Sequence, residues 1–230
     1  MRCALSGDSI VDRFVVVQGS DYPILSQRSI NEFFDANAGA NFINAYDVMA
    51  RGDSADIGKY LYNWNLKDSS LKARLSNKLK ASLALSNLRV FSKKPGCVRL
   101  SDGKEMRIFS GWAHFSLTRK TAEYMVSFHD SHPEYNDYFR TVYASDESYF
   151  HTIFWNSDLS DTNIVPQAFK HWEHDLLLNN TYFEYPDVVR EWRKAEEYAE
   201  LLKTGKLFFR KVDSVMSKEL LDTIDASAAR

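Results

Sequence analysis

Glu147 is the side chain in this sequence best placed for acid–base chemistry. It stands in Ser145-Asp146-Glu147, where Ser145 is a good helix N-cap and the acidic residues fall in the first turn of the expected helix. Apolar residues follow at spacings of three and four: Phe150, Ile153 and Phe154. One stripe of this helix is therefore expected to face a core. A carboxylate held there could act as a general base, unless its role is only to offset the helix dipole.

Two further positions have residue types that suit a ligand site. Asp21 lies just past the carboxyl end of an expected strand, Arg13–Val17, which is where open α/β sheets bind ligands. A turn aspartate of this kind can also serve only nearby backbone amides. Gly111 would let a ligand or a second backbone approach closely. The adjacent Trp112 is either a core residue or a platform on which a sugar ring packs.

A metal site is the alternative chemistry for the helix that carries Glu147. Glu147 and His151 are four residues apart and share a helix face, a spacing that suits metal ligands. Other histidines could complete the site: His114, His129, His132 and His174. This combination would indicate a metal-dependent hydrolase, although the histidines share no motif.

Four stretches resemble, in the same order, motifs of the core-2/I-branching glycosyltransferases, glycosyltransferase family 14, particularly their bacterial members. They are Val17–Ser26 (L-S-G-x-D-Y-P-I-x-S), Ser110–Arg119 (G-x-x-W-F-S-L-T-R), Ala144–Ser157 (S-x-D-E followed by aromatics) and Leu207–Asp213 (L-F-A-R-K-F-D). The resemblance implies that Glu147 is the catalytic base. It also implies that Lys211 neutralises the donor diphosphate, with Arg210 as its neighbour, whereas adjacent cations at a strand end are otherwise ordinary surface charges. Thr181 stands where relatives carry a diphosphate-binding arginine.

The resemblance as a whole implies an inverting glycosyltransferase with an A-type α/β fold, a mixed sheet flanked by helices, in one catalytic domain over residues 1–230. The donor is expected to be a UDP-sugar carrying N-acetylglucosamine or xylose, and the acceptor a hydroxyl of a glycan or another molecule. Asp21 and Trp112 are expected to open on one cleft with Glu147. No metal is expected, since no Asp-x-Asp pair ends a strand.

One alternative comes from the position of the Asp21 segment. In the family this segment follows an earlier half that helps to bind the nucleotide, so the chain is expected to be N-terminally truncated. A remnant of the same fold that binds glycan without catalysis is therefore the alternative function.

The elements that would position these residues follow from caps, turns and periodicity. Arg13–Val17 is expected to be a strand buried on both faces. A helix capped by Ser26 and a strand at Asn41–Ala45 would complete a strand–helix–strand unit, which is parallel by default. A hairpin is expected around Asp102-Gly103, and Thr118 should cap a helix. Further elements are expected as a strand through Tyr60, Tyr62 and Trp64, and as helices over Ser69–Leu88, from Pro186 to Lys203-Thr204-Gly205, and over Lys218–Ile224.

Composition limits the class of protein. With 230 residues, 44% of them hydrophobic, the chain can bury a full core. A net charge of −2 without a basic stripe argues against a nucleic-acid partner. Cys3 and Cys97 have no paired spacing, which suits a reducing, cytoplasmic location. Neither a signal peptide nor a membrane span is expected, so any membrane contact would be peripheral.

Overall fold

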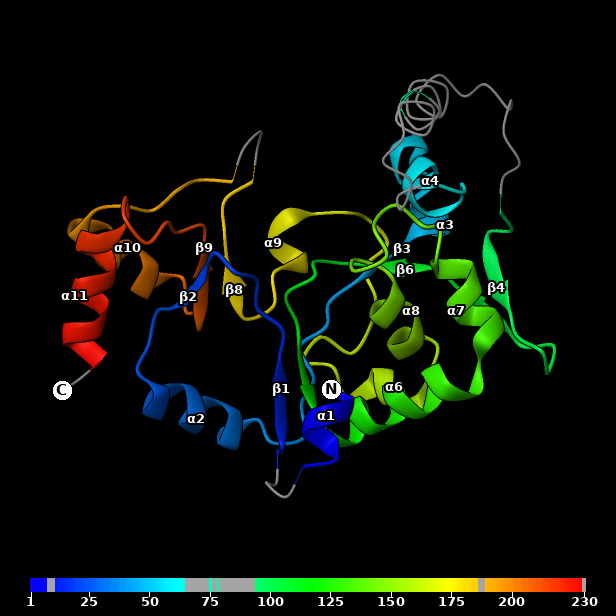
Figure 1. The fold of residues 1–230 in the computed structure, drawn as a ribbon, viewed down its shortest axis with the longest axis horizontal. Coiled ribbons are helices and arrows are strands. Elements are labelled where there is room, and N and C mark those ends of the chain that lie inside the picture. The colour runs from blue at the N-terminus through cyan, green and yellow to red at the C-terminus, as the bar shows by residue number, and fades with distance from the viewer. Residues whose placement is uncertain (8–10, 65–74, 76–77, 79–93, 186–188, 229–230) are drawn as a thin grey trace.

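The structure, a computed structural model, describes residues 1–7, 11–64, 75, 78, 94–185 and 189–228. Its helices are α1 (Arg2–Leu5), α2 (Gln27–Ala36), α3 (Val48–Arg51), α4 (Ser54–Tyr60), α6 (Arg119–Ser131), α7 (Pro133–Phe139), α8 (Tyr149–Trp155), α9 (His174–Leu177), α10 (Tyr198–Lys203) and α11 (Lys218–Ala228), with 3-10 turns η1 (Asp158–Thr162) and η2 (Ala195–Glu197). Its strands are β1 (Arg13–Val15), β2 (Asp21–Pro23), β3 (Tyr46–Asp47), β4 (Cys97–Arg99), β5 (Glu105–Arg107), β6 (Phe109–Ser110), β7 (Ser116–Thr118), β8 (Thr181–Tyr182) and β9 (Phe208–Arg210). Helices and small sheets are mixed throughout, which confirms the predicted α/β class (Figure 1).

The sheets are small and mostly antiparallel. β1 pairs with β7, β3 with β6, β4 with β5 and β2 with β9, all antiparallel, while β8 runs parallel to β9. The predicted parallel strand–helix–strand unit is therefore wrong. Arg13 lies opposite Thr118, and the expected strand at Asn41–Ala45 forms only single bridges at its first two residues. β1 is also only half-buried, and Val17 just beyond it is 49% exposed.

Three elements that depend on a cap or a tight turn agree with the sequence. Ser26 caps α2 by accepting a hydrogen bond from the Ser29 amide at 3.2 Å. Thr118 caps α6 in the same way. The hairpin at Asp102-Gly103 joins β4 to β5, and Gly103 has the positive φ of 88° that this turn requires.

Other predicted elements differ from the structure. Tyr60 ends helix α4 and is not part of a strand, because its stretch continues a helix that begins at Ser54. In the expected helix after Pro186, residues 189–194 have neither helical nor strand structure, although α10 does end at Lys203 as predicted. Most of the expected helix over Ser69–Leu88 lies outside the described residues.

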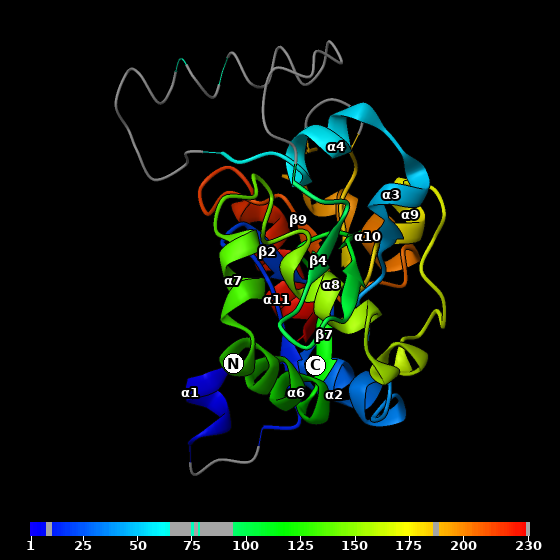
Figure 2. The ribbon, with the colours of Figure 1, turned by 90° about the vertical axis from the view of Figure 1, so that its right-hand side faces the viewer.

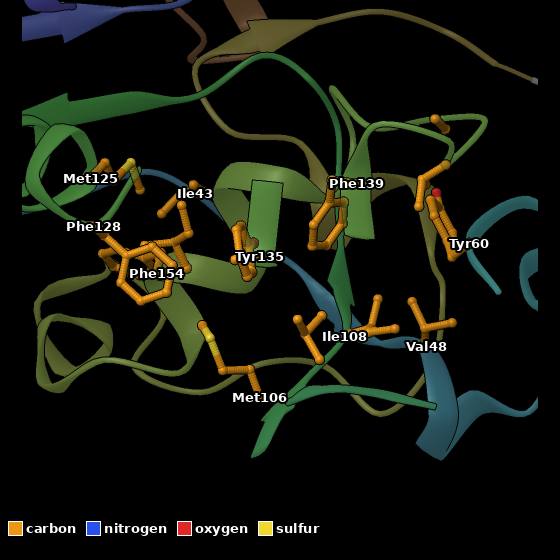
Figure 3. Close-up of a cluster of buried hydrophobic side chains, with 14 of the residues drawn as sticks. Ile43, Val48, Tyr60, Met106, Ile108, Met125, Phe128, Tyr135, Phe139 and Phe154 are labelled. Carbon is orange, nitrogen blue, oxygen red and sulfur yellow. The ribbon is translucent and has the colours of Figure 1, made fainter. Parts of the chain in front are cut away.

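The main hydrophobic core surrounds α8. Figures 1 and 2 show α8 between α4 and α6, and Figure 3 shows side chains from these elements meeting in the core. Ile153 and Phe154 of α8 have no exposed surface, as the apolar spacing predicts. Full burial of a side chain of this size stabilises the fold by about 1.5–3 kcal/mol. A second core, which includes the buried Trp192, lies beneath α10 and α11.

Candidate active site

Helix α8 is fixed to the neighbouring strand segment by two polar side chains. The Thr152 hydroxyl accepts from the Phe109 amide at 3.1 Å and lies 3.2 Å from the Phe109 carbonyl, to which it donates. The Asn156 amide bonds both the N–H and the C=O of Arg107, at 2.9 and 2.8 Å. These side chains satisfy backbone groups that would otherwise be unpaired beside the core. The segment before α8 is thereby set against the end of β6.

Glu147 does not lie in a helical first turn, so this prediction is wrong. Helix α8 begins at Tyr149 after Ser148, whose side chain forms no cap, and its first turn contains no acidic residue. The Glu147 amide bonds the Ala144 carbonyl at 3.2 Å, and the Ser148 amide bonds Ser145 at 3.3 Å. Because of these two successive hydrogen-bonded turns, α8 begins about one helical turn later in the sequence than a helix capped by Ser145 would. The dipole role proposed as the alternative for Glu147 therefore loses its geometric basis.

Glu147 is held by hydrogen bonds to both its backbone and its side chain. Its backbone carbonyl accepts from the Gly111 amide at 2.9 Å. Its carboxylate oxygen Oε2 accepts from the hydroxyl of Tyr60 at 3.0 Å, and that hydroxyl lies 2.6 Å from the Oγ of Ser110. Helix α4, strand β6 and the turn before α8 thus meet at one carboxylate.

Glu147 lines a cavity of about 330 Å³ that combines aromatic walls with charged residues. The aromatic lining residues are Tyr46, Tyr60, Trp112, Trp172 and Tyr185, and the charged ones besides Glu147 are Arg51, Asp53 and Lys59. Aromatic faces pack against the C–H faces of sugar rings, and charged or hydroxyl groups can orient polar ligands. The cavity therefore has the chemical character of a carbohydrate site with a carboxylate in its wall.

Trp112 lies at the centre of the aromatic cluster. Its ring meets those of Phe183 at 4.9 Å, Tyr185 at 5.6 Å and Trp172 at 6.1 Å, all edge to face. The side chain is half-buried and lines the cavity. It is thus a packed aromatic that also lines the cavity, and its role as a platform for a sugar ring stays a prediction.

Gly111 is a position of close approach, as its sequence context indicated. A methyl group built there would lie 2.2 Å from the carbonyl oxygen of Asn44 and 2.9 Å from the ring of His151. Backbone and a fully buried ring cannot move aside easily.

We expect Gly111→Ala to destabilise the protein by about 1–3 kcal/mol through overpacking. For a chain of this size that lowers the melting temperature by roughly 2–4 °C per kcal/mol. Gly39→Ala is the matched control, because a methyl there meets nothing within 4 Å. Thermal melts of both variants test the prediction, and equal melting temperatures would contradict it.

Asp21 and Arg210 meet in a second, buried cluster. The two residues are register partners on β2 and β9, and Arg210 Nε lies 3.7 Å from Asp21 Oδ1. The Asp21 carboxylate is 1% exposed and accepts from the Gln18 amide at 2.6 Å. His114 Nε2 lies 3.3 Å from Asp21 Oδ2 and 2.9 Å from Arg210 Nη1. Asp21 is not among the residues that line the Glu147 cavity.

The ring of Phe183 connects this cluster to the cavity. It packs against Trp112, and it lies 5.4 Å from the His114 ring and 5.9 Å from the Arg210 guanidinium. Lys211, which follows β9, has an exposed side chain. The predicted site residues thus fall into two groups with one shared aromatic side chain between them.

The histidines proposed as metal ligands are spread over separate contacts. His129 bonds the hydroxyl of Tyr149, His132 bonds Glu134, and His174 bonds the carbonyl of Phe183. Within the described part of the chain, no group of three or more His, Cys, Asp or Glu side chains could hold a metal ion. Burial lowers the pKa of His151 from its ordinary value of 6.5 to about 3, so its ring is neutral near pH 7.

Sequence reasoning did not find Tyr60, Ser110 or Trp172 as residues of this site. Tyr60 lies 87 positions before its partner Glu147. No local pattern marks a contact over that distance. Ser110 and Trp112 both belong to Ser110–Arg119, a stretch that resembles a family motif. That resemblance is the sequence signal that could have located this part of the cavity wall.

A carboxylate in an aromatic-walled cavity can act as a general base beside a surface on which a ligand ring packs. Comparison with models of protein families matches residues 1–184 to the core-2/I-branching enzyme family. The chain belongs to that family, and thus to the glycosyltransferases in the broad sense. Arg210 and Lys211 lie beyond the matched residues. A comparison with curated proteins finds no match.

A helix that crosses a bilayer must be long and predominantly apolar. Among the residues that the structure describes, none of the helices combines the length and the apolar character that a membrane span needs.

Proposed function

We propose that the protein transfers a sugar, N-acetylglucosamine or xylose, with inversion from a UDP donor to a hydroxyl group of a glycan or another acceptor. The observation that carries this proposal is the Glu147 carboxylate in the wall of the aromatic cavity, with Oε2 bonded to Tyr60. Family membership supports sugar transfer as the reaction class.

In the proposed reaction the acceptor sugar occupies the cavity against Trp112 and its aromatic neighbours. Glu147 removes the proton from the acceptor hydroxyl as that oxygen attacks the anomeric carbon of the donor. The bond from this carbon to the UDP oxygen breaks, and UDP leaves with the electron pair. Attack opposite the leaving group inverts the anomeric centre.

The proposed donor side lies at the end of β9. Lys211 would contact the diphosphate directly, because its side chain is exposed. Arg210 beside it is 18% exposed and bonded to His114 and Gln18, so it would add positive charge while fixing the strand end. Asp21 would act with Arg210, which it contacts. We propose that these charges stabilise the leaving group without a metal ion.

The binding test uses UDP and calorimetry. Lys211→Ala should weaken UDP binding by roughly 10- to 150-fold, since a hydrogen bond to a charged group contributes about 1.5–3 kcal/mol. Binding and turnover should be unchanged by EDTA. Lys218→Ala is the matched control, because it removes an exposed lysine that pairs with Asp222 on α11.

Two results would count against the proposal. Turnover that is lost on chelation and restored by manganese would contradict the metal-free mechanism. Glycan binding without any transfer from UDP-N-acetylglucosamine or UDP-xylose would instead favour a binding protein of the same fold.

A further inference from the structure

Tyr60 is a buried residue whose hydroxyl points toward the cavity. Its side chain comes from the last residue of α4 and is 1% exposed. The hydroxyl lies 2.6 Å from Ser110 Oγ and 3.0 Å from Glu147 Oε2. Ser110 is itself 2% exposed and ends β6. A buried phenol usually finds a hydrogen-bond partner, but here one of the partners is the carboxylate that lines the cavity.

The direction of these hydrogen bonds follows from the groups. An ionised carboxylate only accepts, so the Tyr60 hydroxyl donates its proton to Glu147. The Tyr60 oxygen then accepts from the Ser110 hydroxyl. The chain of donors therefore runs from Ser110 through Tyr60 to Glu147. Donation to the first hydroxyl of such a chain strengthens the next bond, particularly in a buried site.

We infer that Tyr60, supported by Ser110, is a positioning residue that holds the carboxylate of Glu147 in the orientation needed for sugar transfer. The inference rests on the proposed function. In the proposed step the acceptor proton moves to the Glu147 carboxylate, and the proton of Tyr60 stays on its own oxygen.

The backbone supports the same geometry. The Gly111 amide donates to the Glu147 carbonyl, and Gly111 directly follows Ser110. One short segment of the chain, Ser110-Gly111, therefore restrains both the main chain and the side chain of Glu147. A general base whose rotamer is fixed loses less entropy in reaching the reactive geometry, which benefits the chemical step more than substrate binding.

The test measures UDP release from UDP-N-acetylglucosamine and from UDP-xylose, each with a panel of glycan acceptors. Tyr60→Phe removes only the hydroxyl, and we expect kcat to fall roughly 10- to 100-fold with KM within about 2-fold. Ser110→Ala should give a smaller loss of kcat. In the Tyr60→Phe background, Ser110→Ala should cause no further loss, because its effect passes through Tyr60.

Tyr138→Phe is the matched control. Its hydroxyl donates at 3.0 Å to the Pro95 carbonyl, and Tyr138 does not line the cavity. It should lower the melting temperature as a lost hydrogen bond does while leaving kcat unchanged. Should Tyr60→Phe fail to fold, Ser110→Ala alone carries the test through the split between kcat and KM.

The Glu147→Gln background separates the two hypotheses. If Glu147→Gln lowers turnover by roughly 10²–10⁴-fold and Tyr60→Phe causes no further loss of the residual rate in that background, the positioning role is supported. If Glu147→Gln lowers turnover in this way but Tyr60→Phe leaves the kcat of the otherwise native enzyme intact, only the positioning role is overturned. If Glu147→Gln itself keeps full turnover, the proposed base is wrong and the role of Tyr60 is overturned with it.

Discussion

Replacing Glu147 by glutamine is expected to lower the rate of sugar transfer by roughly 10²–10⁴-fold, the usual contribution of general base catalysis. Glutamine keeps the shape of the side chain and can still accept a hydrogen bond from Tyr60. It cannot take the proton of the acceptor hydroxyl. The affinity for UDP should hardly change, because the lost interaction belongs to the transition state. Steady-state rates and UDP calorimetry on the same preparation measure both quantities.

Asp146→Asn is the matched control for this substitution. Asp146 is the adjacent acidic residue, it is exposed, and it lines a different cavity, formed with residues of α6 and α7. Its neutralisation should leave the rate unchanged within about 2-fold. A Glu147→Gln variant that transfers sugar at the native rate would refute the assignment of the base. Equal losses in both variants would indicate that charge near the turn, rather than proton transfer, sets the rate.

The structure makes the Glu147→Gln test more decisive, because Glu147 is not placed to interact with a helix dipole, which was the simplest alternative role. A carboxylate in a first helical turn contributes about 0.3–1 kcal/mol through the helix dipole. Glu147 stands before α8, and its carboxylate is bonded to Tyr60. The hydrogen bond from Tyr60 is one contact through which Glu147→Gln can change the stability of the fold. The melting temperature of Tyr60→Phe provides the comparison.

Several predictions that depend on a local cap or turn were right, although the cap at Ser145 was not, and the prediction that depends on distant strand pairing was wrong. Helix α2, helix α6 and the β4–β5 hairpin follow from a serine, a threonine and a glycine that act within a few residues. The partner of β1 is β7, and no local signal selects it over the next apolar run. Single-sequence patterns do not state which strands pair, so the parallel unit was the default assumption and was incorrect.

The same limit applies to the site. Glu147 could be found because its whole motif is contiguous in sequence, and the Thr152 and Asn156 positions of that motif prove to be anchors of α8. Tyr60 could not be found, because the alternation of Tyr60, Tyr62 and Trp64 has the period of a strand. Tertiary contacts of α4 override that alternation. The helix then turns the Tyr60 hydroxyl toward Glu147.

His151 makes the stability of the fold depend on pH. Its side chain is fully buried beside Gly111 and Phe115, and burial lowers its pKa to about 3. The unfolded chain takes up a proton at this histidine near pH 6.5, whereas the folded chain does not until about pH 3. Between these values the unfolded state binds more protons, so stability is fully present above pH 6.5 and is lost as the pH falls.

The expected loss is about 1.4 kcal/mol per pH unit in this window, or roughly 5 kcal/mol by pH 3. Urea denaturation of the native protein at pH 7, 6, 5 and 4 measures the slope. His151→Leu replaces the ring with an apolar side chain of similar size. In this variant the slope of the unfolding free energy against pH should decrease between pH 6.5 and 4 by about 1.4 kcal/mol per pH unit, which corresponds to one proton. His171→Gln is the control, because it removes an exposed histidine from outside the core. An unchanged slope in His151→Leu would show that the folded protein protonates this ring readily, and that water reaches it beneath Gly111.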